Sequence, residues 1–178
     1  MPFPSNCSGL SFPKLVQKDE PPAVSSCRVR LIWATLVAIG AKTIETRGWK
    51  TTYRGKLAIH AAAGLASVGG VAGLYGLCDS EPFHTALRDQ YLPHMLPKGA
   101  IVAVCELIDC VPTEYVRSVK IVRPVQRPGS EWLWTENEKA FGDYTDGRFA
   151  WLLADIRALP EPIPARGALG LWNYEGEL

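Results

Sequence analysis

The sequence predicts a single α+β domain in which short β-strands form a small mixed barrel with short helices inserted between them. Short apolar and alternating segments of strand character recur along the chain, and helical segments separate some of them. These segments do not follow the regular strand–helix–strand rhythm of a parallel sheet. A chain of 178 residues with 47% hydrophobic residues is sufficient for one buried core.

The first 26 residues are expected to form a proline-rich N-terminal arm, followed by one folded domain over residues 27–178. The arm shows no sustained periodicity, and its prolines disfavour regular structure. The start of the chain also lacks the basic-then-apolar layout of a secretory signal.

The first half of the domain is expected to contain one buried helix and two strands. The segment 31–39 is nearly all apolar, and Gly40 follows it where a glycine commonly ends a helix. Strands are expected at 43–47 and 56–61, joined by a turn-like segment. Residues 64–77 repeat glycine every three positions from Gly70, which favours a loosely packed helix over a phosphate-binding loop.

The second half is expected to supply further strands. A short helix is predicted over 83–91, and strands over 99–109, 118–125 and 148–156. The acidic segment 131–146 is predicted to be a loop with one helical turn. The proline-rich tail is expected to be irregular until an apolar anchor at Leu171 and Trp172.

Composition excludes several classes of protein. No apolar run is long enough to span a membrane, and six Trp with high hydrophobic content exclude general disorder. The five cysteines are odd in number and form no C-x-x-C pair. We therefore expect free thiols, a reducing cytoplasmic compartment, no metal and no cofactor.

One short stretch concentrates positive charge in a chain that has 19 basic and 18 acidic residues. Residues 40–56 contain five bases and a single acid, with aromatic residues between the bases. Such a pattern suits a site for a phosphate backbone and stacked bases. It also suits an exposed sheet edge on which Lys and Arg block aggregation. The residues are Lys42, Glu45, Arg47, Trp49, Lys50, Tyr53, Arg54 and Lys56.

Several motifs in the same order resemble the ASCH domain family. The resemblance covers residues 29–172, nearly everything except the arm. The matching elements are WA at 33–34, G-x-K-T-I-E-x-R at 40–47, W at 49, YRG at 53–55, AIHA at 58–61, LPKGAI at 96–101, FGDY at 141–144, GRFAW at 147–151 and GLW at 170–172.

The resemblance implies a PUA-like β-barrel with a cleft beside the G-x-K-x-x-E-x-R element. The family is regarded as an RNA-binding or RNA-processing module. Some bacterial members are amidohydrolases of N4-acetylcytidine, others are reported as ribonucleases, and a eukaryotic coactivator carries a nucleic-acid-binding version. The fold alone does not choose between these functions.

The hydrolase members imply candidate catalytic residues in this chain. Their lysine falls on Lys42, but Glu45 stands where they have a threonine. Their distant glutamate should lie just before FGDY, where Glu138 is near and the closest alignment places Lys139. The catalytic candidates are therefore Lys42, Glu45 and Glu138. If Lys42 lies on the same strand as Glu45, alternation would point the two to opposite faces.

The RNA-binding candidates are Arg47, Trp49, Tyr53, Arg54, Lys56 and Arg148. A structural interpretation stands beside each functional one. Glu45 and Arg47 share one strand face. They are expected either to form a partly buried ion pair with each other, or to contact a ligand, with Glu45 reading the donor edge of a base or acting as general base and Arg47 binding a phosphate. Trp33 and His60 are expected to be packed in the interior. Arg148 is expected to be either a basic side chain in the cleft or a structural partner of Asp143. A second basic set is Arg117, Lys120, Arg123 and Arg127.

Three functional hypotheses follow. The first is a module that binds single-stranded RNA, another nucleic acid or a modified nucleoside in the cleft of Lys42, Glu45 and Arg47, with no membrane or metal partner. The second is a hydrolase of acylated nucleosides or RNA that uses Lys42 and a carboxylate. The third is a protein-interaction barrel tethered by the arm.

Overall fold

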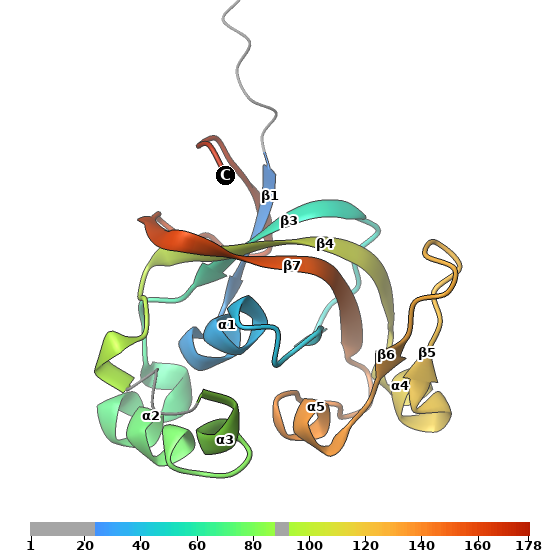
Figure 1. Ribbon diagram of the computed structural model, residues 1–178, viewed down its shortest axis with the longest axis horizontal. Coiled ribbons are helices and arrows are strands. Elements are labelled where there is room, and N and C mark those ends of the chain that lie inside the picture. The colour runs from blue at the N-terminus through green and yellow to red at the C-terminus, as the bar shows by residue number, and fades with distance from the viewer. Residues whose placement is uncertain (1–23, 88–92) are drawn as a thin grey trace, which may run out of the picture.

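The computed structural model describes residues 24–87 and 93–178. Most of its strands belong to one mixed, six-stranded sheet with the order β2-β7-β4-β3-β1-β8 (Figure 1). These strands are β1 (Val24–Val29), β2 (Ile44–Arg47), β3 (Gly55–Ala61), β4 (Ala100–Pro112), β7 (Phe149–Pro164) and β8 (Leu171–Tyr174).

A second, two-stranded sheet and several short helices complete the described part of the chain. The small sheet pairs β5 (Ile121–Val122) with β6 (Trp132–Leu133). The helices are α1 (Leu31–Ala38), α2 (Gly70–Cys78), α3 (Phe83–Leu87), α4 (Thr113–Val119) and α5 (Glu136–Ala140), with 3-10 turns η1 (Ala66–Val68) and η3 (Pro93–Met95).

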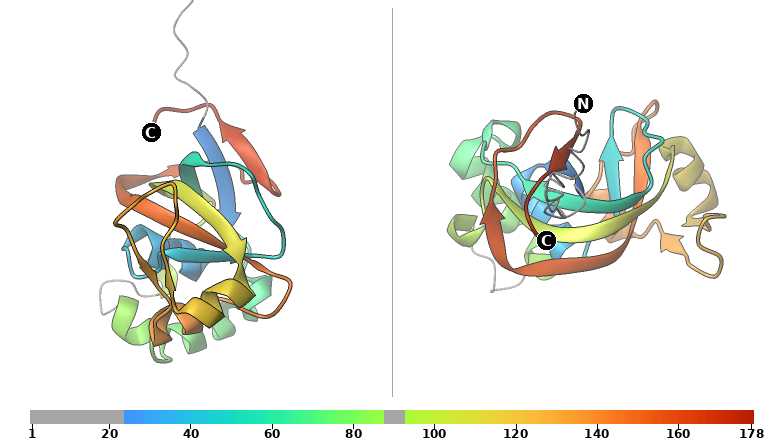
Figure 2. Two further views of the ribbon diagram at one scale, coloured as in Figure 1. Left: turned by 90° about the vertical axis from the view of Figure 1, so that its right-hand side faces the viewer. Right: turned by 90° about the horizontal axis from the view of Figure 1, so that it is seen from above.

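The two long strands, β4 and β7, give the sheet its curvature. They pair antiparallel over most of their length, and the register shifts between Ile101/Ala103, Val104/Glu106 and Leu107/Asp109. Such bulges bend strands and increase their twist. The sheet therefore arches over α1, as Figure 1 and Figure 2 show.

Helix α1 fills the concave side of the arch. Its residues are apolar around most of the helix, as is typical of a helix buried on all sides. It packs against β3, β4 and β7, and it connects β1 to the rest of the sheet, where β1 and β3 run parallel. The core around α1 includes Trp151 and Phe141, both fully buried.

The mixed sheet and its helices confirm the predicted α+β class. Among residues 24–87 and 93–178 the outer strands β2 and β8 do not pair with each other. The hydrogen-bonded ladder is thus open, and closure into a barrel is not confirmed. None of the described helices is long and apolar enough to cross a lipid bilayer.

Most predicted elements of the first half are confirmed. The helix expected over 31–39 is α1, and Gly40 follows it with φ +75°. The strands expected at 43–47 and 56–61 are β2 and β3. The predicted arm lies outside the described residues, except that residues 24–26 belong to β1.

The glycine-rich helix begins later than its sequence suggests. Helix α2 starts at Gly70, where the backbone of Gly73 approaches the carbonyl of Val68 so closely that a Cβ would stand 1.7 Å from its oxygen. Helix α3 covers the start of the predicted 83–91 helix, and residues 88–92 lie outside the described part of the chain.

The strand predicted at 118–125 is wrong for most of its length. Residues up to Val119 belong to α4, which has Glu114 in its first turn, where a carboxylate is favourable, and Val116 buried against the core. Lys120 ends this helix in the left-handed region (φ 61°). Of the predicted strand, only the two residues of β5 pair as a strand.

The proline-rich tail is more regular than predicted. Strand β7 continues through Pro160, Pro162 and Pro164, and β8 adds a last antiparallel strand beside β1. Proline lacks a backbone N–H, so it fits a strand only where a ladder hydrogen bond is not needed. Beyond Leu152, β7 pairs with β4 but no longer with β2, which leaves one edge free for the prolines among the described residues.

Candidate functional site

A cavity of about 850 Å³ opens where several distant segments meet. It lies between the end of β1, the end of β2 with the loop that follows, the loop after β3, and residues 165–167 after β7. Predicted site residues Glu45, Arg47, Trp49 and Arg148 line it. The E-x-R end of the G-x-K-x-x-E-x-R element therefore forms one wall of a cavity.

Lys42 lies beneath this wall and has 0% of its surface exposed. Its Nζ lies 3.7 Å from Glu45 Oε2 and 3.9 Å from Glu138 Oε2, and it donates a hydrogen bond to the carbonyl of Ile44. Strand β2 begins only at Ile44, so the alternation expected to separate Lys42 from Glu45 does not apply. The three predicted catalytic residues are therefore in contact.

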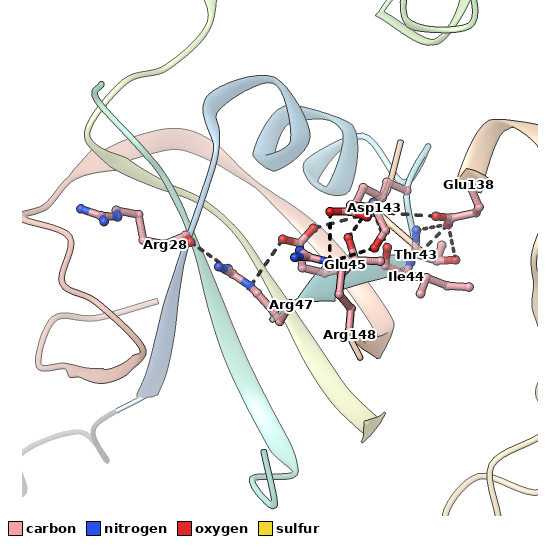
Figure 3. A network of polar contacts seen from close by, with 10 residues as sticks. Arg28, Thr43, Ile44, Glu45, Arg47, Glu138, Asp143 and Arg148 are labelled. Carbon is pink, nitrogen blue, oxygen red and sulfur yellow. Dashed lines mark hydrogen bonds and ion pairs between the residues drawn. The ribbon is translucent and has the colours of Figure 1, made fainter. Parts of the chain in front are cut away.

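Glu138 reaches Lys42 from helix α5, which lies in the other half of the sequence. The hydroxyl of Thr135 caps this helix, accepting a hydrogen bond from the Glu138 amide. Glu138 Oε1 accepts hydrogen bonds from Thr43 Oγ1 at 2.9 Å, from the amide of Ile44 at 3.2 Å, and from the amide of Thr43 (Figure 3). Lys139, which the alignment favoured, is exposed and pairs with Glu136.

The buried position of Glu138 changes its acidity. Burial raises the pKa of its carboxyl, although Lys42 and the hydrogen bonds from Thr43 and Ile44 act in the opposite direction. Glu138 Oε2 has no hydrogen-bond partner. A carboxyl of this kind holds its proton to a higher pH than an exposed one.

Glu45 forms the boundary between the buried charges and the cavity. Its side chain lies between Lys42 and Arg47, whose Nε is 3.5 Å from Glu45 Oε1. Arg47 Nη2 also donates a hydrogen bond to the carbonyl of Arg28 at 2.7 Å, which ties the end of β1 to β2 (Figure 3). The predicted Glu45–Arg47 pair is thus present and faces the cavity.

The cavity is more positive than the chain as a whole. Five arginines line it against two carboxylates, Glu45 and Asp143. Arg148 lines the cavity, and its Nε lies 3.3 Å from Asp143 Oδ2. It is therefore both a basic side chain of the cavity and a partner of Asp143. The other three arginines, which we call the arginine rim, form no ion pair among the described residues; they are Arg28, Arg30 and Arg166.

Aromatic side chains form part of the same cavity. Trp49 is 37% exposed and stands edge-to-face against Trp151, with ring centroids 4.8 Å apart. Trp33, expected in the core, packs partly against it but also lines the cavity, where the Arg30 guanidinium lies 4.1 Å from its ring centroid. The exposed ring of Trp49 therefore lies among the positively charged residues that line the cavity.

Three of the predicted RNA-binding residues lie outside the cavity lining. Arg54 Nη2 binds Asp109 Oδ1 at 2.6 Å, the Tyr53 hydroxyl donates a hydrogen bond to the carbonyl of Lys56, and Lys56 itself is exposed opposite Glu106. The basic stretch therefore has three parts. Arg47 and Trp49 line the cavity, and Lys42 is buried. The residues of 53–56 lie apart from the cavity, on the turn before β3 and at its start.

The arginine rim was missed by sequence reasoning. Arg28 and Arg30 flank the end of β1, whereas Arg166 follows β7. Arg166 approaches the others because the neighbouring Gly167 packs against His60, where a Cβ would stand 2.5 Å from His60 Cε1. His60 is buried as expected, with Nε2 2.9 Å from the Ala165 carbonyl. Only the spacing of Arg28 and Arg30 was visible in the sequence.

The second basic set is engaged elsewhere in the molecule. Its arginines pair with carboxylates, and the Lys120 ammonium lies 3.8 Å from the centroid of the Trp134 ring. The pairs are Arg117 with Asp146, Arg123 with Glu131, and Arg127 with Asp155 and Glu106.

The cysteines of the described chain are free and buried: Cys27, Cys78, Cys105 and Cys110. Burial raises the pKa of the Cys27 thiol to about 11, against the smaller effect of Arg47. Within residues 24–87 and 93–178, no three His, Cys, Asp or Glu side chains are grouped so that they could hold a metal ion.

The ASCH domain family model matches residues 29–162, three quarters of the chain. The chain therefore belongs to the ASCH domain family, and the resemblance seen in its motifs is confirmed. Among curated proteins it is similar to activating signal cointegrator 1 of Homo sapiens, with 35% identity over 148 residues, and to that of Mus musculus, with 23% identity. The match covers 82% of this chain but only 21% of each relative.

A solved structure of the same family was also found. It is a crystal structure of a mutant of ZmASCH from Zymomonas mobilis, 15% identical in sequence, with a TM-score of 0.39. The similarity covers 78% of this chain and 73% of that one.

Replacing Lys42 tests the buried charge cluster. Lys42→Met leaves two buried carboxylates without their cation, so we expect a loss of about 3–5 kcal/mol in the free energy of unfolding. Lys42 lowers the pKa of Glu138, so its removal raises that pKa further. A carboxyl with a raised folded-state pKa favours the fold below its unfolded pKa and loses that contribution as pH rises through the folded one.

The loss in Lys42→Met should therefore be larger at pH 7 than at pH 4, as measured by urea unfolding at both values. Lys56→Met, which changes an exposed lysine, is the control and should alter stability little at either pH. An equal loss at the two pH values would contradict the coupling between Lys42 and the carboxylates.

Proposed function

We propose that the cavity of this ASCH domain binds single-stranded nucleic acid, principally RNA, or one modified nucleoside. The observation that carries the proposal is the arginine rim around a cavity that also presents Trp49. In this proposal the curved sheet corresponds to the PUA-like barrel expected of the family. Membership of the ASCH family supports a nucleic-acid-related role.

The charges of the site divide into two groups with different consequences. Arg47 and Arg148 already have carboxylate partners, so a ligand must compete for them. Arg28, Arg30 and Arg166 are exposed cations with no such partner in the described chain. Phosphate groups suit cations of this kind, because neutralising them releases counterions from the nucleic acid.

Trp49 supplies the second requirement of single-strand binding. An exposed indole ring at a basic groove stacks a base whatever its identity, at a gain of about 1–3 kcal/mol. Its contact with Trp151 fixes the ring in place, so little side-chain entropy is lost when a base stacks. The cavity lining therefore combines a fixed ring with cations that have no carboxylate partner in the described chain.

Salt dependence is the direct test of the proposal. The affinity of the protein for a short single-stranded RNA should fall steeply with salt concentration. Arg28→Ala and Arg166→Ala should each weaken binding and reduce the slope of log K against log salt by about 1. Fluorescence titration at several salt concentrations gives both quantities.

Arg123→Ala is the matched control, because Arg123 is exposed but lies beyond the cavity and pairs with Glu131. Arg54→Ala adds a further comparison, since Arg54 is bound to Asp109 outside the cavity. Binding that ignores salt, or a loss in Arg123→Ala as large as in Arg166→Ala, would count against the proposal.

A second candidate function is hydrolysis of an acylated nucleoside or of RNA. The observation that favours it is the contact of Lys42 with both Glu45 and Glu138 beside the cavity. Burial raises the pKa of Glu138, which suits a group that must hold a proton to a higher pH than an exposed carboxyl does. However, Lys42 is fully buried and donates to the Ile44 carbonyl, so a nucleophilic role requires that it first be uncovered.

Hydrolysis is tested by incubating the protein with N4-acetylcytidine and with short RNAs. If the candidate function holds, acetate release or RNA cleavage occurs and is abolished in Glu45→Gln. Lys139→Met, which alters an exposed lysine outside the cluster, retains activity. Absence of turnover with every substrate would reject the hydrolase and leave the nucleic-acid-binding proposal to its own test.

A further inference from the structure

Glu45 is a carboxylate that has charge partners but no hydrogen bonds. Its closest cations are Arg47 Nε at 3.5 Å and Lys42 Nζ at 3.7 Å, both at long distances for a hydrogen bond. No other residue of the described chain donates to it, yet the side chain is only 9% exposed. Buried polar groups are normally hydrogen-bonded, so Glu45 is available to accept donors from a ligand in the cavity.

The surroundings of Glu45 also fix what kind of partner it accepts. An ionised carboxylate is an acceptor only, on two adjacent oxygens. Lys42 and Arg47 both lie within 4 Å of Glu45, and the arginine rim lines the same cavity as Glu45. A free phosphate would meet a like charge at this position. The end of a ligand that reaches Glu45 must therefore present N–H or O–H groups rather than negative charge.

Among the standard bases, guanine presents two adjacent donors on one edge, at the N1–H and the exocyclic 2-amino group. Adenine and cytosine present an amino group next to a bare ring nitrogen, whose lone pair would face a carboxylate oxygen. Uracil presents one N–H between two carbonyl oxygens. We infer that the cavity selects guanine, with the Glu45 carboxylate accepting both donors of that edge; this inference rests on the proposed nucleic-acid-binding function.

The remainder of the cavity is consistent with a guanosine nucleotide. Trp49 provides an exposed ring for the face of the base, and the arginine rim provides cations for its phosphate. Lys42 holds Glu45 from behind, so Glu45 is positioned before the ligand arrives. Two hydrogen bonds from one base to one side chain discriminate against other bases by about tenfold or more.

Nucleotide affinities of the full chain test the inference. GMP should bind about tenfold or more tightly than AMP, CMP and UMP in isothermal titration calorimetry. IMP keeps the N1–H but lacks the 2-amino group, so its affinity should fall below that of GMP. Equal affinity for GMP and IMP would overturn the bidentate contact even if both bind.

Variants assign the preference to Glu45. Glu45→Gln should reduce the ratio of GMP to AMP affinity to near one, because the amide places a donor against a donor of the base. Glu131→Gln makes the same chemical change on the small sheet and should keep the ratio. If Glu45→Gln fails to fold, the comparison of GMP with IMP on the unaltered chain still decides.

The outcomes separate this inference from the function on which it rests. If all four nucleotides bind alike with salt-dependent affinity, the guanine inference is wrong and the nucleic-acid function stands. A preference for CMP, AMP or UMP would also overturn it. If neither the nucleotides nor short RNAs bind, both proposals fail.

Discussion

The burial of one lysine between two glutamates determines the layout of this ASCH domain. Lys42 lies in the interior, where a charge is costly unless it is paired, and both Glu45 and Glu138 lie within 4 Å of its Nζ. Glu138 in turn holds the backbone of Thr43 and Ile44 through hydrogen bonds. The start of β2 is thereby fixed to α5, and Glu45 is fixed at the cavity.

This arrangement separates charges that maintain the fold from charges that are available to a ligand. Lys42 and Glu138 are buried and pair with each other, and Arg47 in the cavity lining is held by Glu45 and by the carbonyl of Arg28. The arginine rim has no carboxylate partner in the described chain, and the second basic set is paired on another part of the molecule. A chain of net charge +1 thus carries a cationic cavity.

The sequence predicted what depends on neighbours along the chain. The helix over 31–39 follows from an unbroken apolar run ended by Gly40, and the shared strand face of Glu45 and Arg47 follows from a spacing of two. It did not predict contacts made across the fold. Arg166 follows the end of β7 and lies at the rim beside Gly167, which packs against His60. Only the packing of α5 shows that Glu138 rather than Lys139 meets Lys42.

NMR can locate the binding site on the protein. A short single-stranded RNA is titrated into ¹⁵N-labelled protein while side-chain N–H signals of Trp and Arg are followed. If RNA binds in the cavity, the signals of the Trp49 indole and of Arg28, Arg47 and Arg166 shift, whereas those of Arg117, Arg123 and Arg127 do not. Shifts confined to the second basic set, with the cavity residues unperturbed, would contradict binding in the cavity.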